Sequence, residues 1–150
     1  SSYVLRSWTG IGRGFDVYDD GVDFQAARQL WELQRPGMET LAAASDWLEG
    51  MGDAPFFLFL HLYEPHAPYH PPAPFAGRYD DPYDGEVAAA DAVVGGLIRR
   101  LEELGLYDEA LVILLSDHGE GLMDHGEMDH LIFIYREVLQ VPLIVKLPGG

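Results

Sequence analysis

The six histidines of this 150-residue chain fall into two clusters, one within residues 61–70 and the other within residues 118–130. Each cluster directly follows or overlaps the end of a continuous apolar run of strand length, at 56–62 and at 111–115. Ligands of open α/β sheets bind beyond the carboxyl ends of the strands. We therefore expect both histidine clusters to lie on one functional edge of a sheet.

The second cluster opens with the string Ser-Asp-His-Gly-Glu at residues 116–120. The carboxylate of Asp117 beside the imidazole of His118 suits Zn²⁺, Mn²⁺ or a similar divalent ion, and the carboxylate oxygen also suits Ca²⁺ or Mg²⁺. Gly119 would let the backbone turn sharply and approach a ligand. The alternative is that Asp117 only caps a helix and that His118 is merely part-buried. The position after an apolar run, with further histidines nearby, favours a metal site whose remaining ligands come from elsewhere.

His66 and His70 of the first cluster lie in a stretch with six prolines between Glu64 and Pro82, which predicts an irregular loop. Prolines on both sides of His66 would stiffen its backbone, and an imidazole that titrates near neutrality can donate a proton to a leaving oxygen. The alternative is a surface loop in which the histidine is incidental. For His61 and His70 the functional and the incidental interpretations are evenly balanced, and His61 could be a core residue of the strand.

The composition restricts the classes of partner. The chain carries a formal net charge of −16, which disfavours binding to nucleic acid and to anionic membrane surfaces. An anionic ester substrate would require a local reversal of this field, and a bound divalent cation would supply it. The sequence has no cysteine, so disulfides and thiolate metal sites are excluded within these residues, and no apolar run is long enough to span a membrane. The cellular compartment is left open.

The regular elements predict an α/β domain. Residues 36–48 and 84–104 show helical spacing of apolar side chains, with Gly105 placed to end the second helix. The apolar runs at 56–62 and 111–115 lack alternation, which is typical of strands buried on both faces of a parallel sheet. Residues 1–24 are rich in Gly and Asp and predict loops around one short strand. The order helix, strand, helix, strand predicts an open α/β architecture.

The chain resembles the sulfatases of the alkaline phosphatase superfamily. The resemblance follows the family's order and is strongest over residues 36–150. The matching segments are the apolar run before Pro65-His66-Ala67-Pro68, the string Tyr83-Asp84-Gly85-Glu86-Val87, the string at 116–120, and the segment from Tyr135 to Gly149. The resemblance implies that residues 1–150 are one partial catalytic domain, with an open, mostly parallel sheet flanked by helices.

The resemblance also implies roles for individual residues. Asp117 and His118 would bind one divalent metal ion, for which calcium is expected first and manganese, magnesium or zinc are alternatives. His66 would contact the sulfuryl or phosphoryl group and protonate the leaving oxygen. His130, twelve residues after the metal-binding histidine, would contact the same group, although Leu131 replaces the glycine that usually follows it.

The same resemblance implies hydrolysis of sulfuric esters, with a small-molecule or saccharide sulfate or phosphate ester as the substrate. The alternatives are a phosphodiesterase, phosphonate monoester hydrolase or phosphoethanolamine transferase of the same superfamily, and a non-catalytic binding domain derived from it. Sulfatases attack with a formylglycine formed in a Cys/Ser-x-Pro-x-Arg motif, which this sequence does not contain. We expect that segment, and further Asp ligands, to lie upstream of these residues.

If the nucleophile is indeed missing, the isolated 150-residue chain should have little or no activity. The expected outcome is no turnover of aryl sulfates or phosphate diesters above a boiled control. An incomplete domain should also expose sheet edge and apolar surface, which predicts self-association that light scattering would detect. Robust turnover by a mass-verified sample, or a clean monomer at high concentration, would contradict the expectation.

Overall fold

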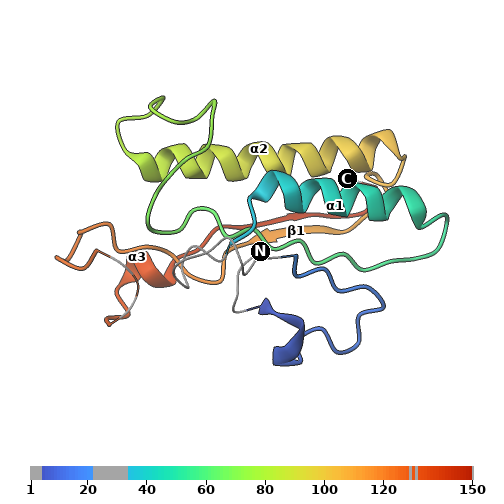
Figure 1. Ribbon diagram of the computed structural model, residues 1–150, viewed down its shortest axis with the longest axis horizontal. Coiled ribbons are helices and arrows are strands. Elements are labelled where there is room, and N and C mark those ends of the chain that lie inside the picture. Colours follow the sequence, from blue (N-terminus) through green and yellow to red (C-terminus); the bar gives the residue numbers. More distant parts are fainter. Residues whose placement is uncertain (1–4, 22–33, 129, 131, 150) are drawn as a thin grey trace. The chain divides into compact units, whose positions relative to one another are not determined.

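The computed structural model describes residues 5–21, 34–128, 130 and 132–149. Its elements are, in order, the 3-10 helix η2 (Ser7–Thr9), α1 (Gly37–Gly50), α2 (Pro82–Glu103), β1 (Val112–Leu115), α3 (Arg136–Leu139) and β2 (Leu143–Lys146) (Figure 1). The chain divides into two compact units, Ser1–Arg100 and Leu101–Gly150, which are described separately below.

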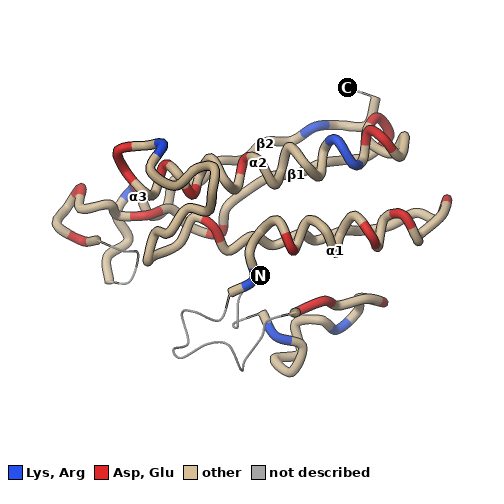
Figure 2. The backbone as a smooth tube through the Cα atoms, turned by 45° about the horizontal axis from the view of Figure 1, so that its top comes forward, with Lys and Arg blue, Asp and Glu red and all other residues tan. Residues whose placement is uncertain are grey.

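In the first unit, α1 and α2 run side by side (Figures 1 and 2). α1 buries Leu41, Ala44 and Leu48, three residues at helical spacing along one face. Gly96 of α2 makes the close approach possible, because a Cβ atom there would lie 2.4 Å from the Cδ2 atom of Leu41. The core of this unit is therefore a helix–helix contact.

Two carboxylates outside this contact fix the ends of α1. Oε1 of Glu64 accepts a hydrogen bond of 2.8 Å from the backbone N–H of Gly37, the first residue of the helix. This satisfies one of the N–H groups that a helix start leaves without a partner, and it places a negative charge at the positive end of the helix dipole. At the other end, Glu49 forms an ion pair with Arg100 of α2. Figure 2 shows that acidic residues recur along α1, so this basic partner lies beside a helix whose charged residues are all acidic.

In the second unit, β1 and β2 form a two-stranded antiparallel sheet in which Val112 pairs with Lys146 and Leu115 pairs with Leu143. The ammonium of Lys146 donates hydrogen bonds to the carbonyl oxygens of Tyr107, Asp108 and Ala110, at 2.6, 2.7 and 3.3 Å. It also lies 4.6 Å from the centre of the Tyr107 ring. This one side chain joins the end of β2 to the turn that leads into β1.

The structure confirms several of the predicted elements. α1 and α2 match the predicted helices within two residues at each end, β1 matches the predicted strand at 111–115, and Gly105 follows α2 with a left-handed φ of 69°. No helix among the described residues is both long and apolar enough to span a membrane.

One predicted strand is wrong, and another lies partly outside the described residues. Residues 56–62 form no assigned strand, and Phe57 and Phe59 are 72% and 62% exposed rather than buried on both faces. An apolar run becomes a buried strand only when neighbouring strands pair with its backbone, and no strand within the described ranges pairs with this one. The short strand expected in residues 1–24 is also absent from the described part, 5–21, which contains η2 instead. The β1–β2 pair is antiparallel, so it does not supply the parallel part of the expected sheet.

The helix–helix contact gives a direct test of the first unit. Leu48 is 3% exposed, so Leu48→Ala should lower the free energy of unfolding by about 2–5 kcal/mol through the cavity that it leaves. Met38 on the same helix is 59% exposed, and Met38→Ala should cost less than about 0.5 kcal/mol. Urea unfolding followed by circular dichroism measures both. Equal effects of the two substitutions would contradict the packing described here.

Candidate active site

The imidazole of His118 has a ring orientation that suits metal binding. Its Nδ1 atom lies 2.8 Å from the carbonyl oxygen of Gly119. A carbonyl oxygen can only accept a hydrogen bond, so this contact requires the proton on Nδ1 and leaves the lone pair of the neutral ring on Nε2. Histidines that bind metals commonly donate their other N–H to a backbone carbonyl in this way. In this form the neutral ring of His118 could bind a metal ion through the lone pair of Nε2.

Asp117 lies beside that donor atom. Its Oδ1 atom is 3.8 Å from Nε2 of His118, and it also accepts the backbone N–H of His118 at 3.0 Å. Two metal–ligand bonds together span about 4–5 Å, so one ion could touch both atoms. The Asp117 side chain is 81% exposed, so its carboxylate is accessible. No group of three or more metal-binding side chains gathers within the described parts of the chain, so these two residues could supply only part of a metal site.

The backbone at Gly119 determines where this pair lies. The Gly119 N–H donates a hydrogen bond of 2.7 Å to the carbonyl oxygen of Val138 in α3. A Cβ atom at position 119 would lie 2.0 Å from the carbonyl oxygen of Glu137, which no side chain could tolerate. The sequence predicted that Gly119 lets the backbone approach a ligand, and that stays a prediction. What the close approach at Gly119 contacts in the structure is the chain's own α3.

His130 lies against His118. The two rings stack with centres 3.9 Å apart and planes at 27°. Nδ1 of His130 is 3.1 Å from Oε1 of Glu120, whose side chain is 6% exposed. Glu120 thus fixes the ring of His130 and leaves its Nε2 atom on the other side of the ring. Sequence reasoning did not identify Glu120 as the partner of His130.

A second Asp-His-Gly-Glu string, at 124–127, repeats the string at 117–120 but is used differently. His125 forms an ion pair with Glu137 and stacks on the Tyr135 ring at 4.2 Å. The carboxylate of Glu127 accepts backbone N–H groups of the following loop. These contacts close the loop internally, and Nδ1 of His125 is held by the Glu137 carboxylate, whereas Nδ1 of His118 is held by a backbone carbonyl.

In the first unit, His66 is held at both its backbone and its ring. Its N–H donates a hydrogen bond of 2.9 Å to Oε2 of Glu86, and its ring stacks on Tyr63 with centres 4.2 Å apart. The Nδ1 atom lies 2.7 Å from the carbonyl oxygen of Ala67, which again places the proton on Nδ1 of the neutral ring. Only the protonated imidazolium could therefore donate from Nε2.

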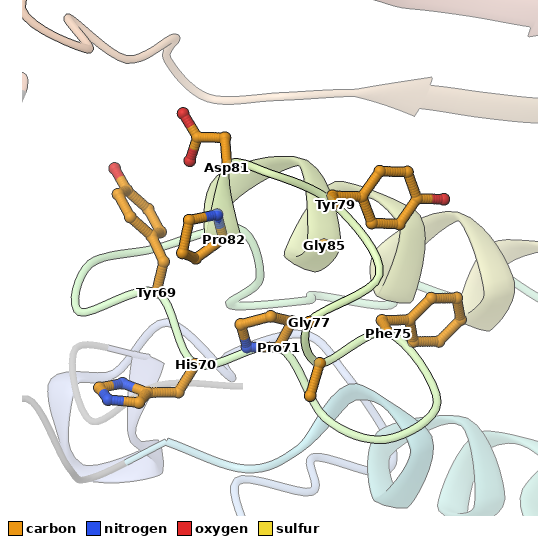
Figure 3. Close-up of a pocket in the computed structure, with 10 residues that line it drawn as sticks. Tyr69, His70, Pro71, Phe75, Gly77, Tyr79, Asp81, Pro82 and Gly85 are labelled. Carbon is orange, nitrogen blue, oxygen red and sulfur yellow. The ribbon is translucent and has the colours of Figure 1, made fainter.

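A small pocket lies between the proline-rich loop and the first turn of α2 (Figure 3). Its volume is about 260 Å³, and its lining includes Tyr69, His70 and Asp81. Gly85 lets the loop pack closely on the helix, because a Cβ atom there would lie 2.8 Å from Cγ of Pro71. His70 is among the residues that line this pocket, a position that no pattern in the sequence indicated.

The structure brings Asp117, His118 and His130 together within the second unit, whereas His66 belongs to the first unit. The roles expected for these four residues stay predictions. Sequence reasoning missed the acidic partners Glu86 and Glu120. A signal for Glu120 was present, because a glutamate next to a Ser-Asp-His-Gly string is a ready hydrogen-bond acceptor for a nearby imidazole.

Comparison with known proteins places these observations in context. A sequence profile of the sulfatase family matches residues 9–150. Steryl-sulfatase of Rattus norvegicus is 31% identical over 105 residues, which cover 69% of this chain and 18% of that protein. N-acetylglucosamine-6-O-sulfatase of Bacteroides thetaiotaomicron is 35% identical over 71 residues, 47% of this chain and 12% of that protein. Human ectonucleotide pyrophosphatase/phosphodiesterase family member 1 is 30% identical over 150 residues, 97% of this chain and 15% of that protein.

The fold is also shared with a solved structure. The crystal structure of the sulfatase-family protein yidJ from Bacteroides fragilis superposes with a TM-score of 0.70 at 22% identity, over 78% of this chain and 32% of that one. This likeness confirms the predicted α/β fold class. The chain spans less than a fifth of the length of each of the three relatives named above.

The pair formed by His125 and Glu137 predicts a measurable titration. The pKa of Glu137 is lowered, mainly by a hydrogen bond from its own backbone N–H and to a smaller extent by His125. A carboxylate with a lowered pKa stabilises the fold at pH values above its ordinary pKa. This contribution is lost as the pH falls through the lowered pKa. In His125→Asn, the pKa of Glu137 should rise toward its ordinary value without reaching it.

Carboxyl ¹³C NMR measures the titration of Glu137 directly. Asp124→Asn, an exposed neighbour of His125, is the matched control and should leave the Glu137 titration unchanged. An unchanged pKa in His125→Asn would show that the ion pair does not form in solution.

Proposed function

The chain belongs to the sulfatase family, and we propose that the protein carrying it hydrolyses sulfuric esters with Asp117 and His118 as one side of a divalent-metal site. One observation carries the proposal. The Nδ1–H of His118 is held by the Gly119 carbonyl, which leaves the Nε2 lone pair 3.8 Å from the Asp117 carboxylate. An oxygen donor and a nitrogen donor so placed match the ligands that divalent ions take in proteins.

A metal bound at this edge would neutralise negative charge on the ester and on the attacking group. Such a cation would also solve an electrostatic problem, because the chain itself carries a formal charge of −16 and repels an anionic ester. Calcium is the ion that we propose first, with manganese, magnesium and zinc as alternatives. The formylglycine of a true sulfatase would have to come from residues other than these.

The histidines supply the remaining chemistry of the proposal. His130, with Nδ1 held by Glu120, would hold charge on the transferred group through Nε2. His66, with Nδ1–H held by Ala67, would give the Nε2 proton of its imidazolium to the leaving oxygen. In both rings a backbone or carboxylate partner fixes Nδ1, and the proposal assigns the contact with the ester to Nε2.

For the substrate we propose a class, namely a small-molecule or saccharide sulfate ester. The names of the relatives that match this chain include a steryl-sulfatase and a saccharide sulfatase. A second candidate function is phosphate diester hydrolysis, which the similarity to the human pyrophosphatase/phosphodiesterase favours, since the matched region covers 97% of this chain. A non-catalytic binding domain is a third, and it predicts no turnover at all.

The repeated Asp-His-Gly-Glu string provides a matched control for the metal site. In the longest natural form of the protein that carries these residues, Asp117→Ala and His118→Ala should each lower turnover of 4-nitrophenyl sulfate by at least about 100-fold, the cost of losing a metal ligand. Asp124→Ala removes the same residue from the second string and should leave turnover within about twofold of the parent. Chelation with EDTA should abolish activity, and added Ca²⁺ or Mn²⁺ should restore it.

The choice of substrate separates the candidate functions. Comparing kcat/KM for 4-nitrophenyl sulfate and bis(4-nitrophenyl) phosphate in the same preparation ranks the two ester classes. A higher value for the sulfate supports the proposal, and a higher value for the diester favours the phosphodiesterase. Equal losses in Asp117→Ala and Asp124→Ala would contradict the metal assignment.

A further inference from the structure

Glu86 is a buried acidic residue near the start of α2. It is 6% exposed, although the chain is strongly acidic and most of its carboxylates are on the surface. A buried carboxylate is costly unless hydrogen bonds replace its water. Here each oxygen accepts one backbone N–H, since Oε2 accepts that of His66 at 2.9 Å and Oε1 accepts that of His70 at 2.7 Å.

The two donors are four residues apart in the proline-rich loop. A carboxylate can accept from both at once, whereas an amide of the same size offers a single acceptor oxygen. Both acceptor oxygens of Glu86 are therefore in use, which a glutamine could not match. The single side chain of Glu86 on α2 holds two points of the loop.

We propose that Glu86 is a positioning residue that fixes the imidazole of His66 for its reaction, together with His70 on the wall of the neighbouring pocket. The proposal rests on the proposed function, in which His66 protonates the leaving oxygen. The Tyr63 ring and the Ala67 carbonyl orient the imidazole, but they belong to the same stretch of chain and move with it. Glu86 belongs to α2, so its hydrogen bonds tie that stretch to the helical core.

The link between His66 and His70 has a consequence for the substrate. His70 lines the pocket beside Tyr69, and its Nδ1 atom is held by the carbonyl oxygen of Pro68 at 3.1 Å. Because both histidines are held by one carboxylate, a displacement of the loop at Glu86 shifts the proton donor and the pocket wall together. Loss of Glu86 should therefore impair the chemical step more than it weakens ground-state binding.

Hydrogen exchange of the 150-residue chain tests the clamp independently of any activity. In Glu86→Gln, NMR should show at least about tenfold faster exchange for the amide of His66 or His70, since one charge-assisted hydrogen bond is lost. Amides in the middle of α1 should exchange as in the parent. Glu86→Ala should expose both amides. Asp91→Asn, which alters an exposed carboxylate on the same helix, is the matched control and should change neither.

Turnover in the longest natural form tests the positioning role. Glu86→Gln should lower kcat for the sulfate ester about tenfold and change KM less than about twofold, while Glu86→Gln combined with His66→Ala should be no slower than His66→Ala alone.

Additive losses would overturn the proposal, as would unchanged exchange at both amides in Glu86→Gln or equal acceleration of every amide. If exchange changes as expected but His66→Ala leaves turnover intact, the proposed function is wrong at His66. If His66→Ala is inactive but the two amides stay protected in Glu86→Gln, the role of Glu86 is wrong and the proposed function stands.

Discussion

The contact between Gly119 and the backbone of residues 137–138 is the constraint on which the second unit depends. The 2.0 Å separation between a hypothetical Cβ atom and the Glu137 carbonyl oxygen leaves glycine as the residue that fits. The Gly119 N–H then donates to Val138, which is itself buried. This joins the end of the Ser-Asp-His-Gly string to α3, and α3 leads directly into β2. A turn that must carry two candidate metal ligands is thus anchored by main chain, which leaves the side chains of Asp117 and His118 available for other contacts.

The local patterns in the sequence were sufficient to predict α1, α2 and β1. They also single out Asp117 and His118, whose donor atoms lie 3.8 Å apart, while a metal-binding role for the pair stays a prediction. Helical spacing in α1 and α2 depends on residues within the same element, and Gly105 marks the helix end by its own conformational freedom. The strand at 56–62 failed because strand formation depends on partners distant in sequence, and composition cannot show whether those partners are present. The exposure of Phe57 and Phe59 is the consequence.

Acidic residues were the part of the site that the sequence concealed. Glu64, Glu86 and Glu120 each stabilise another group, namely the start of α1, the proline-rich loop and the ring of His130. A glutamate of this kind looks like any other in an acidic chain. The two Asp-His-Gly-Glu strings show the difficulty clearly, because identical residues at 117–120 and 124–127 have different partners. What separates them is the surrounding backbone, which allows Gly126 a left-handed φ of 80° in open space but presses Gly119 against α3.

Lys146 is the single lysine of the chain, so its ε-amine is the sole side-chain amine available for acylation or amine-directed conjugation. Three carbonyl oxygens and the Tyr107 ring surround it. An acyl group would remove its charge and two of its three N–H donors, and would release β2 from the turn before β1. Reagents that label amines would therefore act on the tertiary structure of this protein itself, and immobilisation or fluorescent tagging is better directed to an engineered cysteine, since the chain has none of its own.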